Sequence, residues 1–267
     1  MSGILLATVI VGGVGLLIGV LLGIAAQKFK VQVDEKEEQI ASILPGNNCG
    51  GCGMAGCSAM AKAIASGAAP ANGCPVGGAA VAEQIGKIMG VDVTSEKKVA
   101  FVKCSGDCES TERTYEYSGN HSCLELVYLT GGGDKSCSYG CLGYGSCVDA
   151  CQFDALSIVN GVAKVNPDNC VACGKCISTC PKHLIELVPA KATCFVECSS
   201  KDKGKDVMSV CKKGCIGCKL CERNCEANAI TVTDNIAHID YEKCTGCGAC
   251  AQKCPKKIIR VNDAKAE

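Results

Sequence analysis

The chain has 267 residues, including 26 Cys and 32 Gly, with no Trp and only 4% aromatic residues. Its 27 Lys and Arg residues balance 27 Asp and Glu residues, which argues against a nucleic-acid-binding surface. So few aromatic side chains argue against an ordinary hydrophobic core, and we expect bound inorganic clusters to supply much of the interior. So many cysteines kept as metal ligands also predict a reducing compartment, the cytoplasm.

The amino-terminal segment, residues 1–30, is predicted to be a membrane anchor. No charged residue occurs from Ile4 to Ala26, a stretch of 23 residues against the roughly 20 that span a bilayer. The alternative is a secretory signal peptide, but the basic start that such a peptide needs is missing. Lys28 and Lys30 follow the apolar stretch, and by the positive-inside rule they place the rest of the chain on the cytoplasmic side of the cell membrane.

A first cluster domain is predicted in residues 31–97. It has four cysteines in the pattern C-x2-C-x4-C-x16-C-P: Cys49, Cys52, Cys57 and Cys74. Glycines between them allow the turns that a loop around a cluster requires, and a short helix is expected from Ser58 to Ser66. An all-cysteine ligand set fits a 4Fe-4S cluster or a zinc site. We favour the cluster because ferredoxin-like motifs follow.

Those motifs read C-x2-C-x2-C-x3-C-P at residues 170–181 and again at 244–255. Bacterial-type ferredoxins use this spacing, and the fourth cysteine binds a different cluster from the first three. A structural zinc site would instead stop at four ligands from two C-x2-C pairs. We expect each fourth cysteine to begin a helix, since the Pro that follows suits a first helical turn.

A repeat of 74 positions organises the carboxyl-terminal half of the chain. Eight cysteines recur at this offset: Cys137, Cys141, Cys147, Cys151, Cys170, Cys173, Cys176 and Cys180 map onto Cys211, Cys215, Cys221, Cys225, Cys244, Cys247, Cys250 and Cys254. The predicted fold is α+β, with two tandem two-cluster ferredoxin domains at 134–190 and 211–267 and connectors at 98–133 and 191–210.

Each ferredoxin domain is expected to contain a β-hairpin. In the first, β-prone runs flank Asn160-Gly161, a strong hairpin turn signal. In the second, the turn falls at Asp234-Asn235. The expected strands are Ala155–Val159 with Val162–Val165 and Ala229–Thr233 with Ile236–Ile239.

Exchange of the fourth cysteine between motifs assigns the ligands of the regular clusters. Three complete sets result: Cys151 with Cys170, Cys173 and Cys176; Cys254 with Cys215, Cys218 and Cys221; and Cys225 with Cys244, Cys247 and Cys250.

The remaining site of the first ferredoxin domain is irregular. It has Cys141, Cys147 and Cys180, but the counterpart of Cys218 is Tyr144. We assign Cys137 as the fourth ligand because it lies four residues before Cys141. The alternatives are a three-iron cluster or a ligand from outside the domain.

Six cysteines stay unassigned: Cys104, Cys108, Cys123, Cys194, Cys198 and Cys211. They lie in the connecting segments, which contain the similar sequences V-K-C-S-G-D-C and F-V-E-C-S-S. They are either ligands of a sixth cluster or buried structural thiols. The chain therefore predicts at least five 4Fe-4S clusters.

No nucleotide-binding fingerprint and no Walker A motif accompany the cysteines. We therefore predict a carrier of single electrons, without a substrate-converting site of its own, and two-electron hydride chemistry would belong to flavin or nicotinamide on a partner. We expect a soluble donor to dock at the second ferredoxin domain and a membrane partner near the cluster of Cys49 to Cys74. The alternatives are the electron-input subunit of another membrane reductase and a zinc-binding scaffold.

The order of these features resembles a known family. An apolar amino-terminal segment, C-G-G-C-G-M-A-G-C with a distant C-P, the run K-S-C-S-Y-G-C-L-G-Y-G-S-C and paired ferredoxin motifs resemble the B subunit of the Rnf-type ion-translocating ferredoxin:NAD oxidoreductase complex, in its long clostridial form. The resemblance covers nearly the whole chain. The shorter forms of this subunit have a single two-cluster ferredoxin domain, so the duplicated half is a departure.

The resemblance implies a function. Soluble reduced ferredoxin would deliver electrons to this subunit, which would pass them to the membrane subunits of the complex. Flavins held elsewhere would finally reduce NAD, while sodium ions or protons cross the membrane. Cys49, Cys52, Cys57 and Cys74 would match the family's amino-terminal cluster motif, and the eight cysteines of each ferredoxin half its cluster loops, except at Tyr144.

Overall fold

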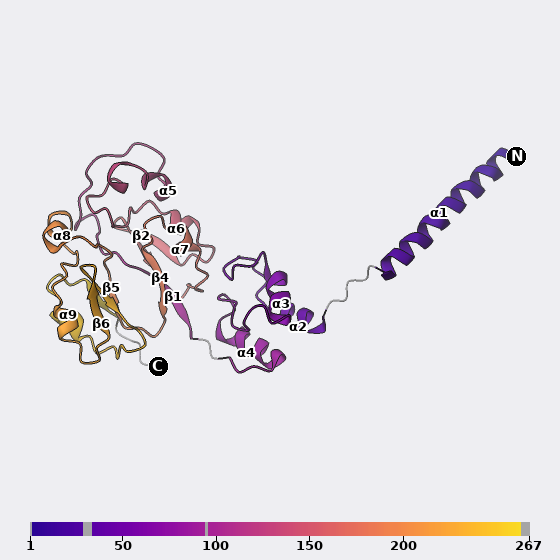
Figure 1. Ribbon diagram of the computed structural model, residues 1–267. Helices are drawn as coiled ribbons and strands as arrows, with labels where there is room; N and C mark the ends of the chain where they lie inside the picture. The colour runs from indigo at the N-terminus through magenta and orange to yellow at the C-terminus, as the bar shows by residue number, and fades with distance from the viewer. Residues whose placement is uncertain (1, 29–33, 94–95, 263–267) are drawn as a thin grey trace.

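A computed structural model describes residues 2–28, 34–93 and 96–262 of the chain. Three regions follow one another in Figure 1: a long amino-terminal helix, a small helical lobe, and a larger region of short strands and helices. The predicted α+β class is confirmed. The strands pair in four separate two-stranded sheets, so no extended sheet organises the described part of the fold.

The first helix, α1, runs from Ser2 to Lys28 and stands apart from the rest of the described chain (Figure 1). Its described apolar side chains are exposed, with Leu16 at 72% and Leu22 at 64%. A search of the described residues finds no helix with the length and apolarity that crossing a membrane requires, so the predicted transmembrane span is not confirmed. Lys30 lies outside the described residues.

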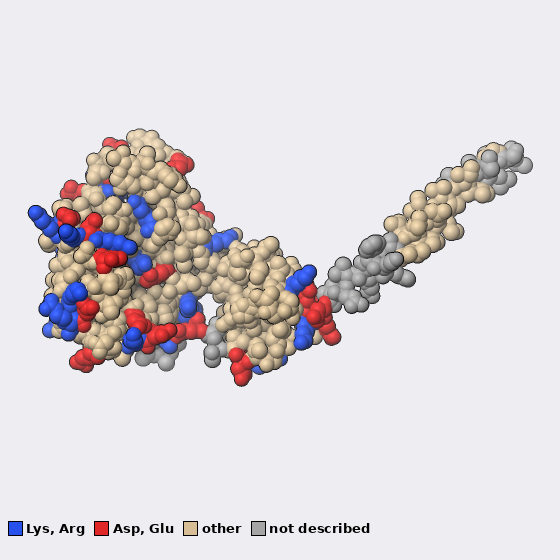
Figure 2. All heavy atoms as spheres, in the orientation of Figure 1, with Lys and Arg blue, Asp and Glu red and all other residues tan. Residues whose placement is uncertain are grey.

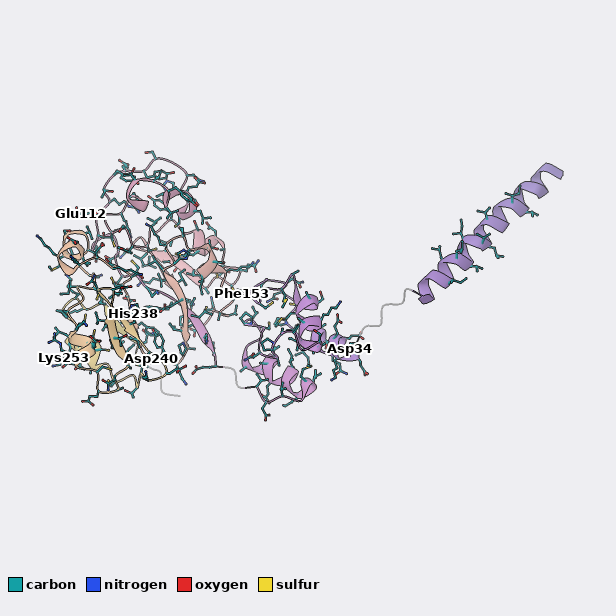
Figure 3. All side chains as sticks on the ribbon, viewed as in Figure 1. Asp34, Glu112, Phe153, His238, Asp240 and Lys253 are labelled. Carbon is teal, nitrogen blue, oxygen red and sulfur yellow. The ribbon has the colours of Figure 1, made fainter. Side chains whose placement is uncertain are left out.

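The small lobe consists of α2 (Glu35–Ile43), α3 (Cys57–Ala65) and α4 (Gly78–Met89). Asp34 caps α2 by accepting a 3.0 Å hydrogen bond from the backbone N–H of Lys36. The lobe's largest fully buried side chains come from all three helices: Ile40, Met60, Ile64 and Ile85. The helix predicted from Ser58 to Ser66 is confirmed as α3, shifted by one residue. Asp34 marks the end of the lobe that faces α1 in Figure 3.

Both predicted hairpins are present. β2 (Leu156–Val159) pairs antiparallel with β3 (Val162–Val165), and β6 (Ile230–Thr233) pairs with β7 (Ile236–Ile239). The turn residues Asn160 and Gly161 have φ of 48° and 74°, as a two-residue type I′ turn requires. The strands of the second hairpin repeat those of the first at the 74-residue offset.

Two further sheets join the connectors to the ferredoxin motifs. β1 (Lys98–Val102) pairs with β4 (Ile185–Pro189), and β5 (Cys194–Val196) pairs with β8 (Ile259–Val261). The sequence prediction missed these sheets, because the partners of β1 lie about ninety residues further along the chain, and such pairings leave no local signal. Each connector thus begins with a strand of a ferredoxin half.

The helices of the ferredoxin halves are short, and their placement corrects a prediction. α7 (Lys175–Thr179) and α10 (Ala249–Lys253) end just before the fourth cysteine of each motif instead of beginning there. Pro181 follows Cys180, and because Pro has no backbone N–H it cannot continue α7. The other short helices are α5 (Cys123–Leu126), the 3₁₀ turn η1 (Thr130–Gly132), α6 (Ser146–Asp149), α8 (Gly204–Val210) and α9 (Leu220–Arg223).

An aromatic contact is one of the interactions that join the two halves. Phe101 of β1 stacks on Phe195 of β5 with ring centroids 4.9 Å apart, and Arg260 of β8 lies over both rings. The buried cores on each side contain cysteines among small aliphatic side chains. Figure 2 shows Lys and Arg interspersed with Asp and Glu over this region, whereas the part of α1 that is not drawn in grey shows neither.

Candidate metal centres

Cysteines gather in groups of four around separate cavities. Three of the groups are sets that the sequence predicted, and the structure brings each of them together. They are the N-terminal site (Cys49, Cys52, Cys57, Cys74), site B (Cys151, Cys170, Cys173, Cys176) and site C (Cys215, Cys218, Cys221, Cys254).

The N-terminal site lies between the loop of residues 44–56 and the first turn of α3. The backbone N–H of Cys57 donates a 2.7 Å hydrogen bond to Oδ1 of Asn48, which ties the loop to the start of the helix. Gly56 must be glycine for this contact, because a Cβ there would lie 2.8 Å from the same oxygen. The loop therefore presents its cysteines in a fixed arrangement.

The N-terminal site also touches the ferredoxin region. A Cβ on Gly51 would lie 2.6 Å from the carbonyl oxygen of Cys173, so the loop between Cys49 and Cys52 packs against the site B loop. Phe153, which lines the site B cavity, lies on the side of the ferredoxin region that faces the helical lobe in Figure 3. The two sites are thus neighbours.

Backbone N–H groups donate to the cysteine sulfurs in the same way in both halves. Ala155 donates to Sγ of Cys151 at 3.4 Å, and its counterpart Ala229 donates to Sγ of Cys225 at 3.3 Å. Ala100 of β1 adds a 3.3 Å bond to Sγ of Cys170. Hydrogen bonds to ligand sulfurs tune the potential of a cluster, so Ala100 of β1 would tune a cluster held at site B.

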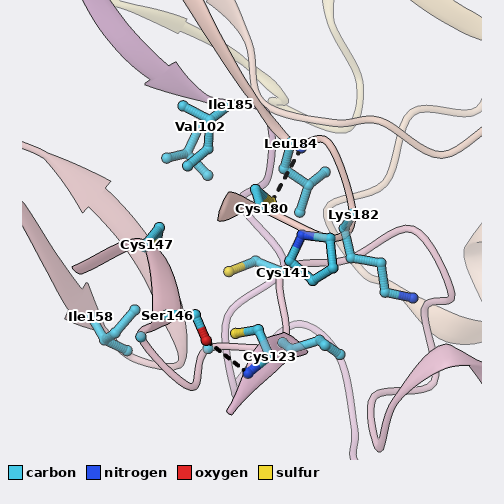
Figure 4. A pocket seen from close by; sticks show the side chains of 15 residues that line it. Val102, Cys123, Cys141, Ser146, Cys147, Ile158, Cys180, Lys182, Leu184 and Ile185 are labelled. Carbon is cyan, nitrogen blue, oxygen red and sulfur yellow. Dashed lines mark hydrogen bonds between the residues drawn. The ribbon is translucent and has the colours of Figure 1, made fainter. Parts of the chain in front are cut away.

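The irregular site differs from the prediction. Cys141, Cys147 and Cys180 line one cavity, and the fourth cysteine there is Cys123, the first residue of α5 (Figure 4). The Oγ atom of Ser146 accepts a 3.0 Å hydrogen bond from the N–H of Cys123 and so holds α5 at the cavity. We call this group site A (Cys123, Cys141, Cys147, Cys180).

Tyr144 stands where the repeat would put a cysteine, and its side chain has another role. Its hydroxyl group donates a 2.6 Å hydrogen bond to Oδ2 of the buried Asp134, and it accepts one from Arg113. Arg113 also forms an ion pair with Asp134. The network joins the segment around residue 113 to the loop that carries Cys141, and so stabilises the long insertion from which Cys123 comes.

Cys137 lies at a different cavity from the one predicted. The structure places it with Cys104, Cys198 and Cys211, three of the cysteines that the sequence left unassigned. Cys137 was predicted at the site of Cys141 because the two are close in sequence. In the structure, the turn from Cys137 to Gly140 directs the side chains of Cys137 and Cys141 to different cavities. We call this second group the inter-half site (Cys104, Cys137, Cys198, Cys211).

Site D consists of the predicted set Cys225, Cys244, Cys247 and Cys250. Its members are close enough to affect one another: after burial, the charges of Cys194, Cys225 and Cys247 contribute to the raised pKa of Cys244. Cys194 of β5 is buried beside them and shares a hydrogen bond with Cys250.

Burial makes these thiols hard to ionise without a metal. Burial and then the charges of the neighbouring Cys141 and Cys123 raise the pKa of Cys147 to about 12. Burial likewise raises the pKa of Cys176 and of Cys221 to about 11, again with contributions from neighbouring cysteines. A thiolate is the form that ligates metal, so cation binding must supply the free energy of deprotonation here.

The arrangement of four sulfurs around each cavity fits a cluster. Among the described residues, no group of three or more Cys, His, Asp or Glu is arranged to hold one metal ion. A cubane has an iron at each of four corners with its own thiolate, so its ligands surround a volume instead of converging on one point. Four cysteines around a cavity fit that requirement.

Sequence reasoning did not place Cys123 at site A. One signal was available: the repeat leaves the first half one cysteine short at Tyr144, while the long connector holds a cysteine without a counterpart. This signal favours Cys123 over Cys137, because Cys137 has a counterpart in Cys211. The packing of α5 against Ser146 brings Cys123 to the cavity.

Comparisons with protein families agree with the groups of cysteines. Residues 44–76 match a family of Fe-S cluster segments, residues 162–185 a 4Fe-4S binding domain, and residues 214–258 a 4Fe-4S dicluster domain. The matched segments include cysteines of the N-terminal site and of sites B, C and D. The fold and its cysteines thus define an iron–sulfur protein with several clusters, of the bacterial ferredoxin class.

Similar proteins identify the family. The chain is 47% identical to the B subunit of an ion-translocating oxidoreductase complex from Methanosarcina acetivorans, over 91% of this chain and 93% of the relative. It is 44% identical to the B subunit of the Na(+)-translocating ferredoxin:NAD(+) oxidoreductase complex of Acetobacterium woodii, over 91% and 73%, and 39% identical to the proton-translocating counterpart from Clostridium ljungdahlii, over 90% and 85%. The chain belongs to this family of B subunits, as its resemblance implied.

Proposed function

We propose that this chain is the iron–sulfur electron carrier of an ion-translocating ferredoxin:NAD oxidoreductase complex. It accepts electrons from reduced ferredoxin and passes them to membrane subunits of the same complex. The observation that carries the proposal is the gathering of predicted cysteines into groups of four around separate cavities, in a chain whose relatives bear the name of this complex.

The chain's own residues would hold at least five 4Fe-4S clusters, at the N-terminal site and at sites A to D. A bound cluster takes up and releases one electron at a time. The protein would supply four thiolates to each cluster and backbone N–H donors to sulfurs such as those of Cys151 and Cys225. Such a chain would have the means for electron transfer, and its sequence contains no dinucleotide-binding fingerprint for hydride transfer.

The order of the sites supports a route along the chain. Sites A and B share the first ferredoxin half, where the charge of Cys176 contributes to the raised pKa of Cys147. The contact of Gly51 with Cys173 then joins site B to the N-terminal site. We infer that the donor docks at the second ferredoxin half, near site D, and that the membrane partner contacts the helical lobe.

The division of labour with the partner subunits is testable. The purified chain should be reduced by reduced ferredoxin, seen as bleaching of its visible absorption, and should not reduce NAD by itself. The control is the whole complex, which should reduce NAD under the same conditions. Direct reduction of NAD by the isolated chain would refute this function.

We further propose that α1 anchors the chain at the cell membrane, with the folded regions on the cytoplasmic side. Its supports are the exposed apolar side chains of the described part of α1, among them Val9, Leu17 and Leu21, and the absence of charged residues from Ile4 to Ala26. Burying such side chains in lipid is favourable by about 1.5–3 kcal/mol each. No other described helix exposes a comparable run.

A charge introduced into α1 tests the anchor. In cells without the partner subunits, the unaltered chain should sediment with membranes after a high-salt wash. The double variant Leu17→Lys with Leu21→Lys should appear mainly in the soluble fraction, since each Lys costs about 3 kcal/mol in the bilayer. Met208→Lys, which alters an exposed apolar side chain of α8, is the control and should stay with the membranes. Membrane retention of the double variant would contradict the proposal.

A further inference from the structure

The inter-half site is a cavity lined by four cysteines that no family match includes. Cys104, Cys137, Cys198 and Cys211 lie outside the segments 44–76, 162–185 and 214–258. The volume of this cavity, counted with its opening to solvent, is ≈ 390 Å³. The cavities of sites A and C have ≈ 400 and ≈ 350 Å³, and those of site B and the N-terminal site ≈ 330 Å³. The inter-half cavity is therefore of the same size.

The four cysteines come in two equivalent pairs, one pair from each ferredoxin half. Cys137 and Cys211 are separated by the 74-residue repeat. Cys104 lies two residues after the end of β1, and Cys198 lies two residues after the end of β5, the equivalent strand of the second half. The site is thus complete only where the two halves meet.

Cys104 of the first half and Cys198 of the second accept equivalent hydrogen bonds at their sulfurs. The backbone N–H of Cys141 donates to Sγ of Cys104 at 3.4 Å, and the N–H of Cys215 donates to Sγ of Cys198 at 3.3 Å. Cys141 and Cys215 occupy the same position in the repeat, so the two halves repeat this contact. These N–H···S bonds are of the kind found at the regular sites, such as the bond to Cys151.

The backbone around the cavity is fixed from both sides. The N–H of Ser105 donates to the carbonyl oxygen of Glu197 at 3.0 Å, and the hydroxyl group of Ser199 donates to the carbonyl oxygen of Lys103, also at 3.0 Å. A Cβ on Gly106 would lie 3.6 Å from the sulfurs of both Cys104 and Cys211. The two connector segments therefore cross at the cavity, and both halves bring cysteines to it.

We propose that the inter-half site binds a further 4Fe-4S cluster, the sixth of the chain. Each of the four thiols would release its proton as its sulfur binds an iron. The proposal rests on the proposed function and extends it, because ligands of site A (Cys141) and site C (Cys215) are the backbone donors to Cys104 and Cys198. The cluster would then lie between the two ferredoxin halves.

This position gives the sixth cluster a role. Without it, sites A and B in the first half and sites C and D in the second have no described cysteine site between them. With it, an electron moves from the site C cluster to the inter-half cluster, so the first is oxidised and the second is reduced by one electron. In the next step the inter-half cluster passes one electron to the site A cluster. No bond of the chain forms or breaks in these steps.

Iron and sulfide content of the full chain, purified without oxygen, tests the proposal. We expect about twenty-four irons and as many sulfides per chain, four for each of six cubanes. The double variant Cys104→Ala with Cys198→Ala should lose about four of each and one cluster's share of the electron paramagnetic resonance signal of the reduced protein. Cys108→Ala, an exposed cysteine in the same connector, is the matched control and should lose none.

About twenty irons in the unaltered chain would overturn the proposal even if the double variant failed to fold. The proposal also fails if the folded double variant keeps the iron content of the unaltered chain, or if the missing cluster is replaced by one zinc per chain. Twenty irons would leave the proposed function standing, whereas a chain without iron would refute both.

Discussion

Replacing Cys123 by alanine is expected to remove the fourth ligand of site A. The site would keep Cys141, Cys147 and Cys180, so the chain should lose about one iron if a three-iron cluster survives, or about four if the cluster is lost. A three-iron product would also give an electron paramagnetic resonance signal in the oxidised protein. Iron content and that spectrum, measured on protein purified without oxygen, check the prediction.

A control variant and a double variant show whether the loss of iron is specific to site A. Cys108→Ala removes an exposed cysteine of the same connector and should leave the iron content unchanged. Cys123→Ala and Cys137→Ala act at different cavities, so their iron losses should add in the double variant. If Cys123→Ala alone left all the iron in place, Cys123 would not be a ligand, and losses that failed to add would indicate that both residues serve one cluster.

Replacing Gly51 by valine is expected to slow electron transfer between site B and the N-terminal site several-fold. A Cβ at this position would lie 2.6 Å from the carbonyl oxygen and 3.1 Å from the Cβ of Cys173, so the two loops must move apart. Electron tunnelling falls off steeply with distance, and a small separation therefore has a large effect. The measurement is the rate at which the N-terminal cluster is reduced after mixing with reduced ferredoxin, followed by freeze-quench spectroscopy.

Ala55→Val is the control, because it places the same valine side chain at an exposed residue of the same loop. It should keep the rate of the unaltered chain. Both variants must keep the full iron content, so that a slower rate reports on the contact and not on a damaged cluster. A normal rate in iron-replete Gly51→Val would remove this contact from the proposed route.

Elements whose signal lies in neighbouring residues could be predicted from the sequence. The hairpin turns at Asn160-Gly161 and Asp234-Asn235 could be predicted because a two-residue turn leaves its signal in adjacent residues. The helix that follows the third cysteine of the N-terminal site could be predicted for the same reason. The strands β1 and β5 could not, since each pairs with a strand far along the chain and its few residues look like any short apolar run.

The cysteine sites could likewise be predicted where their ligands are regularly spaced in the sequence. The cysteines of sites B and C could be grouped from spacing, because the two motifs of one ferredoxin half exchange their fourth ligand in a regular way. Site A broke that regularity, since an insertion supplies Cys123 in place of the residue at Tyr144. The inter-half site depends on how two connectors cross, which the resemblance between V-K-C-S and V-E-C-S hinted at but did not specify.

The proposed clusters also explain why so short a set of strands can fold. The buried residues of the second half are aliphatic side chains and cysteines, and its sheets have only two strands each. Isolated two-stranded hairpins are at best marginally stable in water. Metal binding at the cysteines would add its own free energy to folding, as in other small metal-binding domains.

The visible spectrum and metal content of the full chain, purified without oxygen, test the central claim most directly. The account predicts a brown protein with broad absorption near the blue that dithionite bleaches, and with iron and sulfide in equal amounts. A colourless protein that contains zinc, or whose cysteines are joined in disulfides, would contradict it.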